Sequence, residues 1–289
     1  MNEIDKTKNQ KDKNDENDEK IQGCTACVVF PDGHCVWGNG FGNEGIHVAE
    51  ICFNTSMTGY QEIMTDLSYA GQIVNFTFPH IGNTGTNKKD NESNSTVALG
   101  MLTRNMPTMT SHWQSDDTLE NWLKKNKIIG IGNIDTRKIT RIIRSNGAKQ
   151  VAICHSKSGN FDVNKLKNLA KNSIGLEGRE LTASVTCKKK FVWTNTSKYQ
   201  TNKTNKKKDE QKVKIIAIDF GAKWSIFDRL TNSNQSVQVM PANSSFDSIL
   251  ELKPDGIFLS NGPGDPFATF NIFGETILNL LKETDLPIF

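Results

Sequence analysis

Short apolar runs, separated by clusters of glycine, asparagine and serine, fill the first part of the chain. Residues 25–30 and 34–38 flank a Pro-Asp-Gly turn at 31–33, and this arrangement predicts a β-hairpin. The further apolar runs are short and rich in β-branched residues, so we expect strands rather than helices. These strands are predicted at 48–54, 72–78, 96–103, 128–131 and 151–155.

From residue 115 the apolar positions recur at helical spacing. Leu119, Trp122 and Leu123 would share one face of a helix that Ser115 or Asp116 caps. A second helix is expected between a capping Asp135 and a terminating Gly147, and a third, polar helix near 162–172. The first part of the chain is therefore predicted to be a β-rich α+β domain.

From residue 213 strands and helices alternate strictly. Strands are expected at 214–219, 237–240, 256–260 and 286–289, with helices at 222–230, 246–252 and 268–281 between them. This repeat predicts a doubly wound parallel sheet, so the fold class is α/β overall. The last apolar strand has no following helix to cover it, and we expect the domain to continue beyond Phe289.

Two polar stretches divide the chain. Residues 1–20 are lysines, acids and asparagines without an aromatic side chain, which predicts a disordered tail. Residues 194–212 are almost free of apolar side chains and predict a flexible linker. The expected domains are therefore 21–193 and 213–289.

Charge and composition argue against a nucleic-acid-binding protein, a membrane protein and a disulfide-bonded one. A formal net charge of +3 over 289 residues is small, and no basic stripe is interleaved with aromatics, so we expect no nucleic-acid partner. No apolar run has the length of a membrane span and no signal peptide is evident, so we predict no membrane contact and a cytoplasmic location. The six scattered cysteines are typical of reduced, mostly buried thiols.

The strand expected at 256–260 ends in the loop Asn-Gly-Pro-Gly-Asp-Pro at 261–266. Ligands of open α/β sheets bind at the carboxyl ends of strands, and glycines there let backbone N–H groups approach a substrate. Gly262 and Gly264 are therefore candidate binding residues. The alternative is a tight turn without chemical importance. Asp265 alone is a poor metal site and is expected to cap the following helix.

Other motifs carry less chemistry. Cys24 and Cys27 form a C-x-x-C without a second pair, in a strand-like run where their side chains would point to opposite faces. The glycines at 38–42 lack the third glycine and the helix of a dinucleotide fingerprint, and no phosphate loop occurs. We therefore expect no metal and no cofactor on this chain. His80 is expected to be a hydrogen-bonded structural histidine rather than a catalytic one.

Five strings, read together, carry a family resemblance. They are FNTSMTGYQE from Phe53, FPHIGN from Phe78, DTRK from Asp135, DFGAK from Asp219 and LSNGPGDP from Leu259. In this order and spacing, from residue 24 to 289, the chain resembles the small, glutamine-hydrolysing subunit of carbamoyl-phosphate synthetase.

The resemblance implies two roles. Residues 21–193 would dock on the large synthetase subunit, and residues 213–289 would be the first part of a class I glutamine amidotransferase domain with a Cys-His-Glu triad. Glutamine would be hydrolysed to glutamate and ammonia, which passes through a tunnel to the large subunit. There it would combine with bicarbonate, with ATP and Mg expected on that partner, for arginine and pyrimidine synthesis.

The resemblance also implies three binding residues. The Gly262 N–H would point at the oxyanion of the tetrahedral intermediate, and Gly264 would let glutamine lie against the backbone. Ser68 matches a first-domain serine that reaches across to the bound glutamine. The active site would then lie in the cleft between the domains.

Departures from the family pattern limit this reading. No cysteine follows Cys187 and no histidine follows His155. The triad is therefore expected beyond Phe289, with none of its members in this chain. The fragment alone should then not hydrolyse glutamine. Smaller departures are Leu67, where the family tends to have proline, and Trp224 and Ser225, where it has a basic residue and asparagine. One alternative is a non-catalytic docking or regulatory subunit. Another, the amidotransferase of anthranilate or guanylate synthesis, would leave the first domain unexplained.

Overall fold

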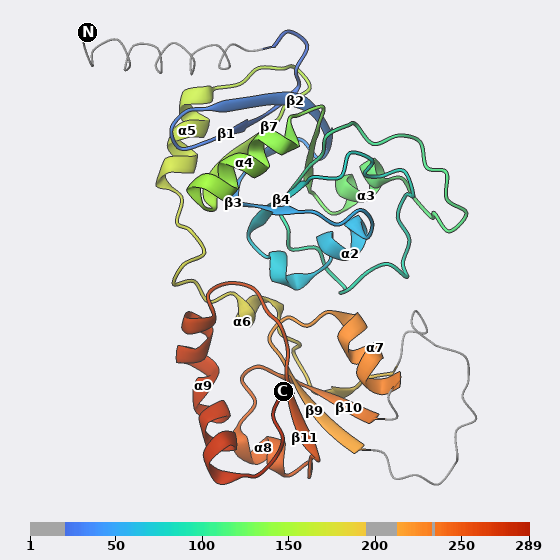
Figure 1. The fold of residues 1–289 in the computed structure, drawn as a ribbon, viewed down its shortest axis with the longest axis vertical. Helices are drawn as coiled ribbons and strands as arrows, with labels where there is room; N and C mark the ends of the chain where they lie inside the picture. Colours follow the sequence, from blue (N-terminus) through green and yellow to red (C-terminus); the bar gives the residue numbers. More distant parts are fainter. Residues whose placement is uncertain (1–20, 195–212, 233–234) are drawn as a thin grey trace, which may run out of the picture. The chain divides into compact units, whose positions relative to one another are not determined.

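The computed structural model describes residues 21–194, 213–232 and 235–289, which form two compact units (Figure 1). Unit 1 holds the described residues up to Tyr60, with Gly71–Asn87 and Ala98–Gly175. Unit 2 holds Gln61–Ala70, Lys88–Val97 and the described residues from Leu176 to Phe289. The predicted tail at 1–20 and all but the first residue of the predicted linker lie outside the described residues. Three segments that the sequence analysis assigned to the first domain, 61–70, 88–97 and 176–193, belong to unit 2.

Seven strands of unit 1 close into a barrel in the order β1-β2-β6-β5-β4-β3-β7. The predicted hairpin is confirmed, because Val29 of β1 pairs with Cys35 of β2 across the turn. The pairs β3–β4, β4–β5 and β5–β6 are parallel, and the others are antiparallel. The strands are β1 Ala26–Val29, β2 Cys35–Gly42, β3 Gly45–Asn54, β4 Gln72–Phe76, β5 Gly100–Leu102, β6 Ile129–Gly132 and β7 Lys149–His155.

The strand β1 is buried on both faces. Ala26 and Val28 belong to the main core cluster of the barrel. Cys27 and Val29, on the opposite face, pack in a second cluster with Leu166 of helix α5, Val163–Asn172. This explains why the sequence of β1 is uniformly apolar instead of alternating with polar residues.

The expectation that Cys24 and Cys27 point to opposite faces is wrong. Both side chains lie in the second cluster, together with Cys35 and Cys154. Strand alternation does not reach Cys24, because β1 begins only at Ala26. Burial raises the pKa of the Cys27 thiol, and the neighbouring thiols raise it further.

The helices α3, Leu119–Lys125, and α4, Thr136–Asn146, lie where the sequence predicted them. Asp135 caps α4 as expected, and Glu120 Oε1 of α3 lies 2.6 Å from Lys124 Nζ one turn further along the helix. The predicted caps of α3 are wrong, since Thr118 caps this helix through the N–H of Asn121. Residues 116 and 117 instead hydrogen-bond the backbone of Thr86, and this long-range pairing delays the start of the helix.

Unit 2 is built on a four-stranded sheet in the order β11-β9-β10-β8. The first three strands are parallel, and β8 lies antiparallel at the edge. The short strand β8 was not predicted. The strands are β8 Phe191–Val192, β9 Val213–Asp219, β10 Gln235–Pro241 and β11 Gly256–Leu259.

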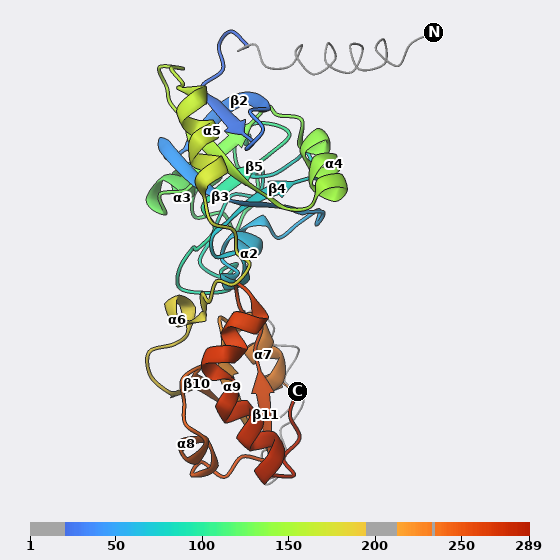
Figure 2. The same cartoon turned by 90° about the vertical axis from the view of Figure 1, so that its left-hand side faces the viewer.

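Helices cover both faces of this sheet (Figures 1 and 2). On one face, the helices α8, Phe246–Leu250, and α9, Pro266–Glu283, pack over Ile216 and Ile218 of β9. On the other face, α7, Trp224–Asn232, packs over Ala217 of the same strand. The run expected as a strand at 286–289 pairs with β11 through an isolated parallel bridge between Ile257 and Ile288.

Candidate active site

Two loops begin at the same edge of the unit 2 sheet. The strands β9 and β11 are neighbours, run parallel and pair up to Ile218 and Leu259. Residues 220–223 therefore start close to residues 260–265, which contain the glycine loop singled out in the sequence. This edge of an open α/β sheet is where ligands bind.

Asp219, at the end of β9, fixes the first loop. Its side chain is buried, with the residue 7% exposed. One carboxylate oxygen accepts the N–H groups of Gly221 and Ala222, both at 2.9 Å, and the other accepts that of Cys187 at 2.8 Å. Hydrogen bonds to an ionised acceptor are the strong ones, so a single side chain holds three backbone groups in place.

Gly262 lies directly against the first loop. A Cβ atom at this position would stand 2.3 Å from the carbonyl oxygen of Phe220. The backbone of Gly262 does not adopt the left-handed region, so the close approach, and not its conformation, requires glycine. Ser260 adds a second link, because its Oγ accepts the Phe220 N–H at 2.8 Å.

Gly264 and Asp265 hold the other side of the loop. Gly264 has φ +80°, and a Cβ there would lie 2.6 Å from the Arg179 carbonyl oxygen. That carbonyl accepts the Asp265 N–H at 3.0 Å, while the Asp265 carboxylate accepts the N–H groups of Gly178 and Phe267. These two bonds lower the pKa of Asp265. Asp265 caps α9, as the sequence predicted.

Ser68 reaches this loop from a distant part of the chain. It lies in the 3₁₀ helix Leu67–Tyr69, where Asp66 accepts the Ser68 N–H at 2.9 Å. The Ser68 Oγ accepts a hydrogen bond of 2.6 Å from Nδ2 of Asn261. Residues 61–70 and 261–264 belong to the same compact unit, so the structure brings Ser68 and the loop of Gly262 and Gly264 together within unit 2.

Lys223 and Glu92 were missed in the sequence. The Lys223 ammonium lies 3.4 Å from the second carboxylate oxygen of Asp66, which ties the 3₁₀ helix to the loop after β9. Glu92 is buried and accepts the N–H groups of Trp224 and Ser225 at the start of α7. Lys223 stands in the string DFGAK, but nothing local marks Asp66 as its partner, and Glu92 lies in none of the five strings. Each residue acts on a segment far away in the chain.

Two family models match the chain. That of the CPSase domain of the carbamoyl-phosphate synthase small chain matches residues 28–153, and that of class-I glutamine amidotransferase matches residues 216–289. The carbamoyl phosphate synthase small chain of Ruegeria pomeroyi is 46% identical, over 92% of this chain and 68% of the relative. Those of Zymomonas mobilis and Bradyrhizobium diazoefficiens are 40% and 44% identical, over 91% and 89% of this chain and 70% and 66% of the relatives.

The chain belongs to the carbamoyl phosphate synthase small chain family. It is the small subunit of a glutamine-hydrolysing carbamoyl phosphate synthase, and its second part matches the glutamine amidotransferase domain. The resemblance seen in the five sequence strings is thereby confirmed. A solved aminopeptidase from Aneurinibacillus sp. strain AM-1 aligns with 83% of this chain and 57% of its own at 11% identity and a TM-score of 0.26, which bears on neither fold nor function.

An amidotransferase of this class needs a thiolate nucleophile, and among the described residues Cys187 is the one cysteine of unit 2. Its backbone N–H donates a hydrogen bond to the carboxylate of Asp219. Burial, with the charge of Asp219 beside it, raises the pKa of the Cys187 thiol to about 12. It therefore stays protonated near neutral pH, where a nucleophilic cysteine must be ionised. Cys187 does not meet the requirement of the chemistry.

The two histidines that the sequence analysis considered do not lie in unit 2. His80 is exposed, and its ring meets that of Phe78 edge-on at 6.0 Å. His155 is buried in the barrel, with Nδ1 2.8 Å from the Asn43 carbonyl oxygen. Among the described residues, no group of three or more His, Cys, Asp or Glu side chains could hold a metal ion. Nor does any helix there have the length and apolar character needed to cross a membrane.

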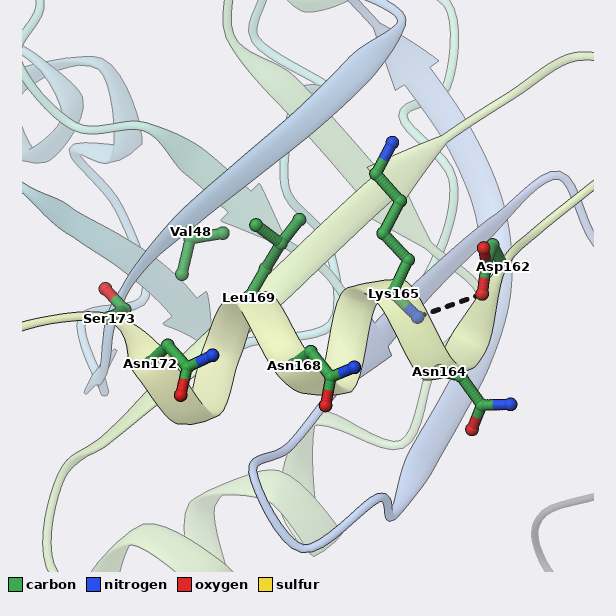
Figure 3. A pocket seen from close by; sticks show the side chains of 8 residues that line it. All are labelled: Val48, Asp162, Asn164, Lys165, Asn168, Leu169, Asn172 and Ser173. Atoms are coloured by element: carbon green, nitrogen blue, oxygen red, sulfur yellow. Dashed lines mark hydrogen bonds between the residues drawn. The ribbon is translucent and has the colours of Figure 1, made fainter.

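A hollow of about 690 Å³ lies elsewhere, on unit 1 beside α5 (Figure 3). Its lining is mostly amide and aliphatic, and the carboxylate of Asp162 already accepts the Lys165 N–H at the start of α5. Neither a cysteine nor a histidine lines it, so its size does not make it the site of an amidotransferase that uses a thiolate. The lining residues are Val48, Asp162, Asn164, Lys165, Asn168, Leu169, Asn172 and Ser173.

Proposed function

We propose that the loops after β9 and β11, together with Ser68, bind glutamine and stabilise the oxyanion formed during its hydrolysis. The observation that carries this proposal is the state of the Gly262 N–H. Gly262 is exposed, and its N–H has no hydrogen-bond partner among the described residues. An unpaired donor on a loop anchored from both sides is suited to an oxygen on which negative charge develops.

Each residue has a separate role in this proposal. The Gly262 N–H donates to the oxyanion, and Gly264 allows the substrate to lie against the backbone. The Ser68 hydroxyl binds an oxygen of glutamine. Anchoring by Asp219, Phe220 and Arg179 holds the donor in position before the substrate arrives, which is the condition under which such donors lower a barrier most.

The partner in this proposal is the large synthetase subunit. Glutamine hydrolysis supplies ammonia, which the large subunit joins to bicarbonate, and ATP and Mg bind there rather than on this chain. The second candidate is a subunit that docks and regulates without hydrolysing glutamine. Nothing in the loop geometry favours that reading, because a docking role does not need the buried Asp219 or the glycine at 262.

One experiment separates the two functions. The complete gene product is co-expressed with its large subunit, and carbamoyl phosphate synthesis is measured with glutamine and with ammonia as nitrogen source. We expect co-purification, synthesis from both sources, and one glutamate released per carbamoyl phosphate formed from glutamine. Synthesis from ammonia alone would support the docking subunit and contradict the proposed function.

A further inference from the structure

Asn261 is the residue that links the glycine loop to Ser68. Its Nδ2 donates to the Ser68 Oγ at 2.6 Å and lies 3.3 Å from the carbonyl oxygen of Gly221. Its Oδ1 is buried without a hydrogen-bond partner among the described residues. The Asn261 amide nitrogen therefore donates to two neighbours, while the amide oxygen accepts no hydrogen bond from the described residues.

The orientation of this amide is fixed by its neighbours. A backbone carbonyl can only accept, so the nitrogen and not the oxygen of Asn261 must face Gly221. The flipped amide would set two acceptor oxygens against each other and leave the Ser68 contact without this donor. Nδ2 has two hydrogens, one for the Gly221 carbonyl and one for the Ser68 hydroxyl.

This orientation decides what Ser68 can do. A hydroxyl has one proton, and because Ser68 accepts from Asn261, that proton must point elsewhere. Ser68 is partly exposed, and no acceptor for its proton is found in the described part of the chain. The hydroxyl is thus set as a donor, ready for an acceptor oxygen of a ligand. Glutamine offers such oxygens in its carboxylate and in its side-chain amide.

We propose that Asn261 is a positioning residue for glutamine: it holds the Ser68 hydroxyl as a hydrogen-bond donor toward the substrate. The inference rests on the proposed role of Ser68 in the function above and adds the residue through which that role is set. Asn261 itself does not need to touch glutamine.

A double-mutant cycle in the holoenzyme tests this. Ser68→Ala and Asn261→Ala should each raise KM for glutamine about 10-fold, the loss of one hydrogen bond to a charged group, with kcat changed much less. The double variant should have the KM of Ser68→Ala alone, because Asn261 then has no hydroxyl to orient. Ammonia-driven synthesis should not change in any of the three. Asn271→Ala, on the exposed surface of α9, serves as the matched control and should keep the wild-type KM.

Asn261→Asp provides a variant of nearly the same shape. Its carboxylate accepts hydrogen bonds, so it should draw the Ser68 proton to itself and raise KM for glutamine above that of Asn261→Ala. A KM for Asn261→Asp at or below that of Asn261→Ala, or additive effects in the cycle, would overturn the inference while leaving the role of Ser68 intact. An unchanged KM in Ser68→Ala would remove Ser68 from the proposed function and the inference with it.

Discussion

Gly262→Pro should lower glutamine-driven carbamoyl phosphate synthesis about 10²-fold below Gly262→Ala, the typical effect of removing one oxyanion donor. Both variants carry a Cβ, which would meet the Phe220 carbonyl oxygen at 2.3 Å. Gly262→Ala therefore reports the steric displacement of the loop with its N–H retained. Gly262→Pro adds the loss of the N–H. The comparison therefore cancels the effect of the Cβ clash, which both variants share.

Ammonia-driven synthesis is the internal control for this pair. It takes place on the large subunit and should be the same in both variants and in the wild type. Equal losses in the two variants would show that the N–H contributes nothing and that Gly262 is needed only for packing. If ammonia-driven synthesis fell by the same factor as glutamine-driven synthesis, the complex itself would be damaged.

Asp219→Ala should lower the free energy of unfolding of unit 2 by about 3–5 kcal/mol. The substitution removes a buried carboxylate and leaves the three backbone N–H groups that it accepts without a partner. These are the N–H groups of Gly221, Ala222 and Cys187. The loop under Gly262 would lose its support, so glutamine-driven turnover should fall as well. Hydrogen exchange of the β9 amides measures the stability of this unit without interference from the barrel.

Two further variants make this prediction specific. Asp219→Asn keeps one side-chain oxygen that can accept these N–H groups. Its free energy of unfolding should therefore fall less than that of Asp219→Ala. Glu275→Ala removes an exposed carboxylate from α9 and should leave the exchange rates of β9 unchanged. Equal exchange rates in Asp219→Ala and the wild type would contradict the role given to this carboxylate.

Local signals allowed most elements to be predicted. Asp135 and Asp265 cap the helices that directly follow them, and the turn at 31–33 joins two strands that pair as a hairpin. In each case the interacting groups lie within a few residues of one another. Propensity and spacing are sufficient there, because no distant segment competes for the same backbone groups.

Long-range contacts account for what the sequence did not show. The edge strand β8 consists of two exposed residues, and only its pairing with β10 makes it a strand. The closure of the barrel depends on β1 pairing with both β2 and β7. The cap of α3 moved to Thr118 because Thr86 pairs with the residues before it. A single sequence has no local feature that records such pairings.

The candidate site divides in the same way. The glycine loop after β11 could be found from its composition, and Ser68 from the family resemblance. Asn261 stood in the same string, but its link to Ser68 spans 193 residues of sequence. The three N–H groups that Asp219 accepts became visible only when the loops were placed in space.

The most direct test of this account is a crystal structure of the holoenzyme with glutamine bound and its hydrolysis blocked. The account predicts a substrate oxygen within hydrogen-bond distance, about 2.7–3.2 Å, of the Gly262 nitrogen and another near the Ser68 Oγ. Glutamine bound away from the loops after β9 and β11, for instance in the hollow beside α5, would contradict it.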